Sequence, residues 1–250
     1  MRHLWLLLLA ALLCAHCLAY MPVKRVSALH KPQGSRSRAL LFASPAPLVK
    51  DAPTGTQRLA VGAISGGLLV SSVAIVKAIE AAERAFPSAV GSWIGTFPVL
   101  GFIFALAGVL HFTIKDEFAN IYPDQGAWGL WFLPGSADFW VLLSGVFEII
   151  GGSGMAFGLV NSLDAVRRIT GIDSSHLFYG SCVSDSALFM LAVVIGVTPA
   201  NIFMYTHGKR LPRDGPEVPA NFHAVRGALQ AVLFAQLYLL AKPTLAALGL

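Results

Sequence analysis

Five polar side chains interrupt the apolar stretches of this 250-residue chain, and their types could bind a small molecule or exchange protons with it. An imidazole and a carboxyl group can exchange protons, whereas a guanidinium and carboxamides bond to oxygen atoms. Ionisable groups inside a membrane are costly, so they normally have a partner or a function. The five candidate ligand-binding residues are His111, Glu148, Asn201, Arg226 and Gln230.

The stretches that carry these residues are long and apolar enough to be membrane helices. Hydrophobic residues make up 56% of the chain, charged residues 12%, and the mean hydropathy is +0.68, as in integral membrane proteins. A hydrocarbon core about 30 Å thick needs about 20 helical residues, and no stretch has the alternation of a β-barrel strand. We expect an all-α transmembrane four-helix bundle with one additional N-terminal membrane or interfacial helix, with spans near 59–76, 95–114, 139–163, 177–205 and 222–240.

Antiparallel threading brings the five candidates into one half of the membrane. Short connections make consecutive helices antiparallel. The second and fourth predicted spans therefore end on one face of the membrane, and the third and fifth predicted spans begin on the same face. We call this the near face. Glu148 follows Asp138 by ten residues, which is about 15 Å from the near face, and the other four candidates lie closer to it. We expect Arg226 to reach Glu148, with Gln230 one turn further along the same helix.

Structural interpretations of the same residues remain open. Glu148 and Arg226 could form an ion pair that only holds the bundle together, or Arg226 could extend alone to the interface. His111 could be an interfacial anchor, and Asn201 could cap a helix end. His111 and Glu148 lie at different depths, which argues against a metal site. Cys182 is the one cysteine after the leader, so a catalytic dithiol is excluded.

The first 58 residues have the composition of a targeting sequence. Residues 1–19 have a basic start, an apolar core and a small residue before a cleavage point, as in a secretory signal peptide. Residues 20–58 are basic and serine-rich, with one acid, as in a transit peptide. Together they resemble the bipartite presequence of algae with complex plastids. We expect a helical membrane domain over 59–250 in a plastid membrane, either thylakoid or envelope, with a secretory-pathway membrane as the alternative.

Charge is distributed unevenly along the chain. Residues 1–58 hold eight of the 18 Lys and Arg residues and one of the 13 acids, so the remainder has 10 bases, 12 acids and a net charge of about −2. This distribution gives no support for nucleic-acid binding. The near-face loop over 116–138 carries Trp128, Trp131 and Phe132, which is typical of an interfacial aromatic belt. Basic residues flank both ends of the spans, so they do not determine orientation.

Four motifs occur in order along the predicted bundle: LAGVLHF (Leu106–Phe112), LSGVFEIIGGSGM (Leu143–Met155), TPANIFM (Thr198–Met204) and Arg226-x-x-x-Gln230. Their order and spacing over about 95–240 resemble DoxX-like membrane proteins, although Ala228 stands where that family often has proline. The resemblance implies a four-helix membrane subunit, of a kind that in some cases belongs to oxidoreductase complexes delivering electrons to quinone. It also implies that the five candidates occupy the family's polar positions.

These observations predict a DoxX-like membrane subunit that binds quinone or another small amphiphile in a polar cavity, within a redox complex. No catalytic residue and no metal ligand is assigned. The alternative is a non-catalytic structural or assembly subunit, which the GxxxG motif of Gly154 and Gly158 favours because it lets another backbone approach closely. A solute carrier is disfavoured, because the sequence has no inverted repeat. Membrane lipids and other subunits are the expected partners.

Overall fold

The structure is a computed structural model that describes residues 48–162, 179–215 and 220–250, and every regular element in these ranges is helical. The predicted signal peptide and most of the transit-peptide-like leader lie outside the described residues. The elements are η1 (Val49–Asp51), α2 (Thr54–Ala85), α3 (Pro87–Ile94), η2 (Phe97–Val99), α4 (Leu100–Thr113), α5 (Lys115–Asn120), η3 (Ala127–Gly129), α6 (Ala137–Ser162), α8 (Tyr179–His207) and α9 (Ala220–Ala247).

Five helical segments of the described chain are long and apolar enough to cross a membrane: Thr54–Ala85, Pro87–Thr113, Ala137–Val160, Cys182–His207 and Asn221–Ala247. This confirms the prediction of an all-helical membrane protein. Outward-facing side chains agree with it, since Leu69 and Val70 of α2 are 65% and 69% exposed. Apolar surface of this kind is stable against lipid chains and unfavourable in water.

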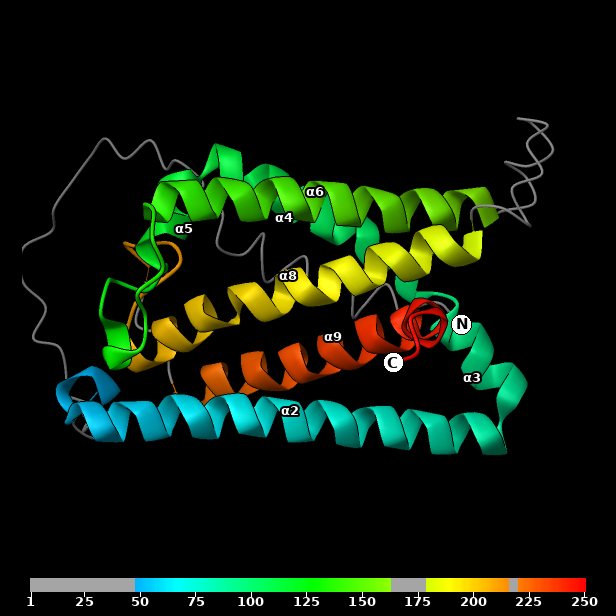
Figure 1. The fold of residues 1–250 in the computed structure, drawn as a ribbon, viewed down its shortest axis with the longest axis horizontal. Coiled ribbons are helices and arrows are strands. Elements are labelled where there is room, and N and C mark those ends of the chain that lie inside the picture. Colours follow the sequence, from blue (N-terminus) through cyan, green and yellow to red (C-terminus); the bar gives the residue numbers. More distant parts are fainter. Residues whose placement is uncertain (1–47, 163–178, 216–219) are drawn as a thin grey trace, which may run out of the picture.

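The long helices pack in the order α4, α6, α8, α9 and α2. Figure 1 shows α8 between the α4–α6 pair and α9, with α2 beyond α9. At the left end in that view, α2, α6 and α9 begin and α8 ends. This end corresponds to the near face, so the antiparallel threading inferred from the connections is the one observed.

Glycines allow α4, α6 and α8 to approach closely. A Cβ atom on Gly101 of α4 would lie 2.5 Å from main-chain atoms of α6, and one on Gly108 would lie 2.6 Å from the Gly145 carbonyl oxygen. Cβ atoms on Gly154 and Gly158 would collide with side chains of α8. Close backbone contact of this kind is how membrane helices gain packing energy without a hydrophobic driving force. The GxxxG motif is therefore used inside this chain.

The predicted helix over 95–114 is divided. The regular helix α4 begins at Leu100, after the short turn η2, which contains Pro98. Proline lacks the N–H that an α-helix would use and fixes its own φ, so it suits the start of a helix and disturbs an interior. α3 precedes the turn, and α3 and α4 together make the second span.

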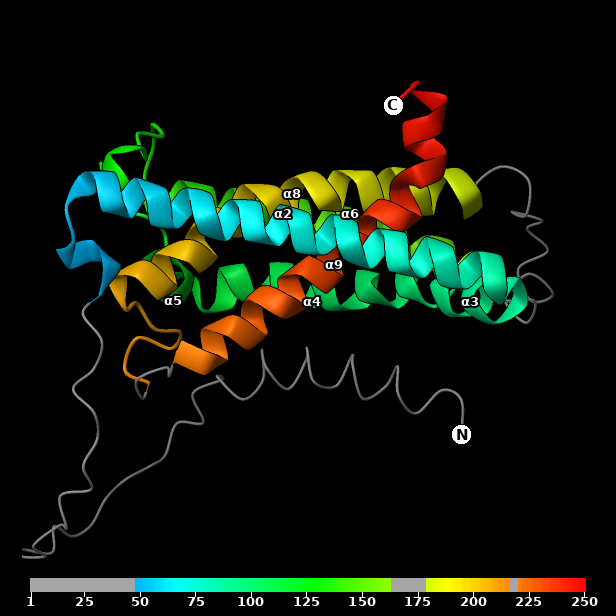
Figure 2. The ribbon, with the colours of Figure 1, turned by 90° about the horizontal axis from the view of Figure 1, so that it is seen from below.

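The helices α2 and α9 are longer than predicted. α2 runs over 32 residues from Thr54, five residues before the predicted span 59–76. Arg58, which the prediction placed in the leader, donates to two main-chain carbonyls of η3 at 3.3 and 3.0 Å, so it belongs to the folded domain. α9 continues through Pro243, and Figure 2 shows that its last turns bend away from the rest of the helix. A helix can pass through a proline with such a bend, because only local hydrogen bonding is lost.

Candidate functional site

A cavity of about 520 Å³ lies between α4, α6, α8 and the loop that joins α5 to α6. Its volume is within the range of about 300–1,000 Å³ that is typical of small-molecule sites. We call it the α4–α6–α8 cavity. Its wall is largely apolar and aromatic, and its polar lining residues are His111, Tyr122, Trp131, Trp140, Ser144, Glu148 and Asn201. Three of the five predicted ligand-binding residues therefore line one cavity.

His111 lies in the last turn of α4, and only 7% of its surface is exposed. Its Nδ1 atom is 2.9 Å from the Ala107 carbonyl oxygen. Because a carbonyl oxygen only accepts, Nδ1 carries the proton in this contact, and Nε2 is the nitrogen left to interact with a bound molecule. The ring stacks on Phe118 of α5, with centroids 3.9 Å apart and planes at 14°. An interfacial anchor would reach water, whereas this imidazole is buried at a cavity wall.

Glu148 lies on α6, eleven residues after Ala137, and is 8% exposed. Its Oε2 atom is 3.4 Å from His111 Nδ1, whose proton is directed to a backbone carbonyl. Oε2 has no hydrogen-bond partner among the described residues. Most buried polar atoms in proteins are hydrogen-bonded, so this oxygen is an exception that needs an explanation.

The structure does not bring Arg226 to Glu148. Arg226 Nη2 donates to Asn201 Oδ1 at 2.6 Å, and Nη1 contacts Met204 Sδ at 3.0 Å. α8 carries both of these partners and lies between α6 and α9. Residue counts predicted the depth of Glu148 and Arg226 in the membrane. They could not predict on which side of α8 each of these side chains lies.

Asn201 joins the cavity wall to a polar network between α8 and α9. Its Nδ2 donates to Gln230 Oε1 at 3.3 Å, and Gln230 Nε2 donates to Thr198 Oγ1 at 2.7 Å. Thr198 in turn donates to the Val194 carbonyl at 2.7 Å. The half-buried amides are thus hydrogen-bonded, and Asn201 links two helices instead of capping one. Arg226 and Gln230 are not among the residues that line the cavity. They lie on α9 and hold Asn201 in place through their hydrogen bonds to its side chain.

The loop between α5 and α6 supplies two cavity residues that the sequence did not identify as binding residues. Tyr122 Oη and Trp131 Nε1 are buried and have no hydrogen-bond partner among the described residues. Their rings meet edge to face with centroids 5.7 Å apart, and burial raises the pKa of the Tyr122 phenol. The one sequence signal for Tyr122 was its place in a Tyr-Pro pair between the first two motifs. Trp131 was expected at the interface, and the structure folds it inward.

Polar contacts at the near face hold α5 and its neighbouring loops beside the cavity. Lys115 of α5 bonds to Asp138 at the start of α6, and this contact raises the pKa of the Lys115 ammonium group. Glu117 accepts a hydrogen bond from the Arg213 main-chain N–H at 2.6 Å, which ties α5 to the loop after α8. Phe118, which stacks on His111, therefore lies on a helix that is held by contacts with α6 and with the loop after α8.

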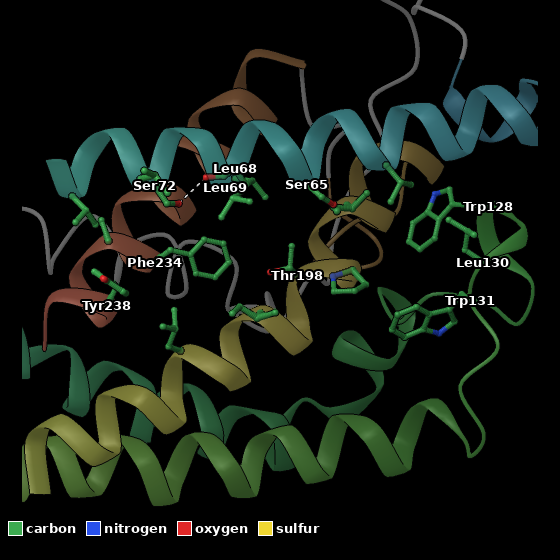
Figure 3. Close-up of a pocket in the computed structure, with 18 of the residues that line it drawn as sticks. Ser65, Leu68, Leu69, Ser72, Trp128, Leu130, Trp131, Thr198, Phe234 and Tyr238 are labelled. Carbon is green, nitrogen blue, oxygen red and sulfur yellow. Dashed lines mark hydrogen bonds between the residues drawn. The ribbon is translucent and has the colours of Figure 1, made fainter. Parts of the chain in front are cut away.

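A second cavity, of about 640 Å³, lies between α2, α8, α9 and η3 (Figure 3). Its wall is mostly apolar, and Trp131 lines both cavities. The hydroxyl groups of Ser72 and Thr198 donate to carbonyls of their own helices, each at 2.7 Å. Because most of its lining residues are apolar, the second cavity suits hydrocarbon better than a polar group.

Within the described ranges, no group of three His, Cys, Asp or Glu side chains could hold a metal ion. Comparisons of this chain with protein-family models, with curated proteins and with solved structures give no match. The DoxX-like motifs therefore remain a resemblance between sequences. The evidence for function is the chemistry of the residues around the α4–α6–α8 cavity.

Proposed function

We propose that this protein is a membrane subunit that binds a small amphiphile of the quinone class in the α4–α6–α8 cavity. Glu148 interacts with an oxygen atom of the bound ring, and His111 Nε2 is a second group that exchanges a proton with it. Asn201 completes the wall. Arg226 and Gln230 act as positioning residues, since they fix Asn201 through hydrogen bonds of 2.6 and 3.3 Å.

The observation that supports this proposal most directly is the unpartnered carboxyl oxygen of Glu148. An acid inside a membrane-spanning helix is costly, and one without a hydrogen-bond partner is more so. In a bundle with a purely structural role, a well-packed apolar residue would be as stable or more stable at this position. Its place beside His111, on the wall of a cavity large enough for a substituted ring, explains why an acid is present.

The sequence motifs and the N-terminal composition extend the proposal to a DoxX-like subunit of a redox complex in a plastid membrane. In such a complex the subunit would hold the quinone while other subunits carry the electrons. The location is tested by fusing residues 1–58 to a fluorescent protein in an alga with a complex plastid. Fluorescence in the plastid is expected, and retention in the secretory pathway would contradict the plastid assignment.

The GxxxG motif, which favoured a structural or assembly subunit, no longer supports that alternative. Gly154 and Gly158 face α8 of the same chain, where added Cβ atoms would collide with side chains. The folding of this chain therefore accounts for both glycines, without a second protein. Ligand binding in the cavity is the function that the geometry supports better.

The test is quinone binding by the purified chain in nanodiscs, with a short-tailed 1,4-benzoquinone as the probe. Glu148→Gln replaces the acid with a neutral side chain of the same shape, and we expect at least tenfold weaker binding. Glu80→Gln is the matched control, because Glu80 is bonded to Lys77 and Lys242 and lines neither cavity. Equal affinity of wild type and Glu148→Gln, or no binding by the wild type, would overturn the proposal.

A further inference from the structure

The described part of the chain has three buried side-chain oxygen or nitrogen atoms without a hydrogen-bond partner: Tyr122 Oη, Trp131 Nε1 and Glu148 Oε2. All three residues line the α4–α6–α8 cavity. Native proteins leave few buried polar atoms without a hydrogen bond, so each such atom needs an explanation. The concentration of all three at one cavity points to a single occupant that bonds to them.

The chemistry of the two loop residues specifies what that occupant must offer. An indole N–H can only donate a hydrogen bond, and a phenol donates as well as accepts. Burial raises the pKa of Tyr122, so the phenol keeps its proton across the physiological range. Tyr122 and Trp131 therefore present two donors side by side, and their natural partner is an oxygen atom with two lone pairs, such as a carbonyl oxygen.

These donors are held in place by the fold. Trp131 donates its main-chain N–H to the Ala127 carbonyl at 3.1 Å and accepts from the Gly126 N–H at 2.7 Å. Gly126 has a φ of +80°, a left-handed conformation that glycine adopts without strain. Tyr122 closes the turn after α5, where its N–H is 3.2 Å from the Ala119 carbonyl. The unpartnered atoms thus belong to an ordered loop, in which the Trp131 N–H lies near enough to the Tyr122 oxygen to offset part of the effect of burial on its pKa, without meeting hydrogen-bond geometry.

We propose that Tyr122 and Trp131 donate to one oxygen atom of the ligand, while the Glu148 carboxyl group donates to a second carbonyl oxygen, or accepts from a hydroxyl group in its place, on the same molecule. The inference rests on the proposed function and narrows its ligand to rings that carry two separate oxygen functions, of which 1,4-benzoquinones and the corresponding hydroquinones are the simplest. A hydrocarbon chain would satisfy none of the three atoms. A molecule with one hydroxyl group would leave one wall of the cavity unsatisfied.

Two variants test the donors. Tyr122→Phe removes one oxygen atom and leaves the ring, and Trp131→Phe removes the N–H while keeping an aromatic side chain. We expect each variant to bind the short-tailed 1,4-benzoquinone about five- to tenfold more weakly than wild type, because a ligand oxygen loses a donor. The matched control is Tyr238→Phe, which changes a tyrosine in the wall of the second cavity.

A ligand with only one oxygen function shows whether Tyr122→Phe removes a specific donor or disrupts the cavity as a whole. A 4-alkylphenol of the same tail length can bond to Glu148 or to the loop donors, but not to both. Its affinity should fall less than twofold in Tyr122→Phe if its oxygen binds at Glu148. Unliganded Tyr122→Phe should also be at least as stable as wild type, because the phenol has no partner to lose. A structural role for the phenol predicts lower stability instead.

The outcomes distinguish the two proposals. If both loop variants bind the benzoquinone as tightly as wild type while Glu148→Gln does not, the ligand site stands and the loop donors are not part of it. If Tyr122→Phe is destabilised and weakens both ligands equally, its role is structural and this inference is wrong. If the wild type does not bind the benzoquinone, both proposals are overturned.

Discussion

Replacing Glu148 with methionine should stabilise the protein and abolish its ligand binding. Methionine has a similar length and no polar atoms that require a partner. An unsatisfied buried polar group costs about 1–3 kcal/mol, so we expect the free energy of unfolding of the unliganded protein to rise by about that amount. For a chain of this size, each kcal/mol moves the melting temperature by roughly 2–4 °C, which gives a rise of roughly 2–12 °C.

The opposite sign is expected if Glu148 has a structural role. Removal of one partner from a buried ion pair typically costs about 3–5 kcal/mol. His111 is the one group within ion-pair distance of Glu148 in the described chain, and its Nδ1 proton is directed to the Ala107 carbonyl instead. The geometry therefore favours stabilisation. The two interpretations differ in direction as well as in size.

The measurement is thermal unfolding of the ligand-free protein in one detergent, followed by tryptophan fluorescence. Glu80→Met is the matched control, because its carboxylate contacts Lys77 and Lys242 at 3.1 and 2.8 Å and has no unmet bond to relieve. Binding of the short-tailed benzoquinone is measured on the same samples. A lower melting temperature for Glu148→Met than for wild type would refute the reasoning, and so would unchanged benzoquinone affinity.

Three further predictions concern the framework around the cavity. Gly101→Ala should lower the free energy of unfolding by about 1–3 kcal/mol in the same assay, because the added Cβ would lie 2.5 Å from main-chain atoms of α6. Gly66→Ala is the control and should leave the stability unchanged, because no atom lies within 4 Å of its added Cβ. Asn201→Ala removes the acceptor of the 2.6 Å bond from Arg226 and should cost about 1–3 kcal/mol; an unchanged melting temperature would contradict that network. Because burial raises the pKa of Tyr122, ionisation of this phenol does not affect the free energy of unfolding below pH about 10, and lowers it as pH rises toward the folded-state pKa. Tyrosinate absorbance, compared between wild type and Tyr122→Phe, should show this phenol ionising above pH 10.

The candidate site shows where sequence reasoning succeeded and where it stopped. His111, Glu148 and Asn201 were placed in one half of the bundle by counting residues along antiparallel helices, and all three line one cavity. Arg226 was expected at Glu148 and instead bonds to Asn201 on the other side of α8. The depth of a residue follows from 1.5 Å per residue, but its direction depends on how each helix rotates about its axis, which only packing fixes.

Length, hydropathy and the positions of charges were sufficient to establish an all-helical membrane protein, because each helix satisfies its own backbone and the bilayer sets its length. The partners of buried polar groups were decided by the tertiary structure. Tyr122 and Trp131 come from a loop whose path depends on Gly126 and on contacts with α8, and no periodic pattern encodes such a path. The unpaired atoms at the cavity wall therefore became visible only when the helices and this loop were packed together.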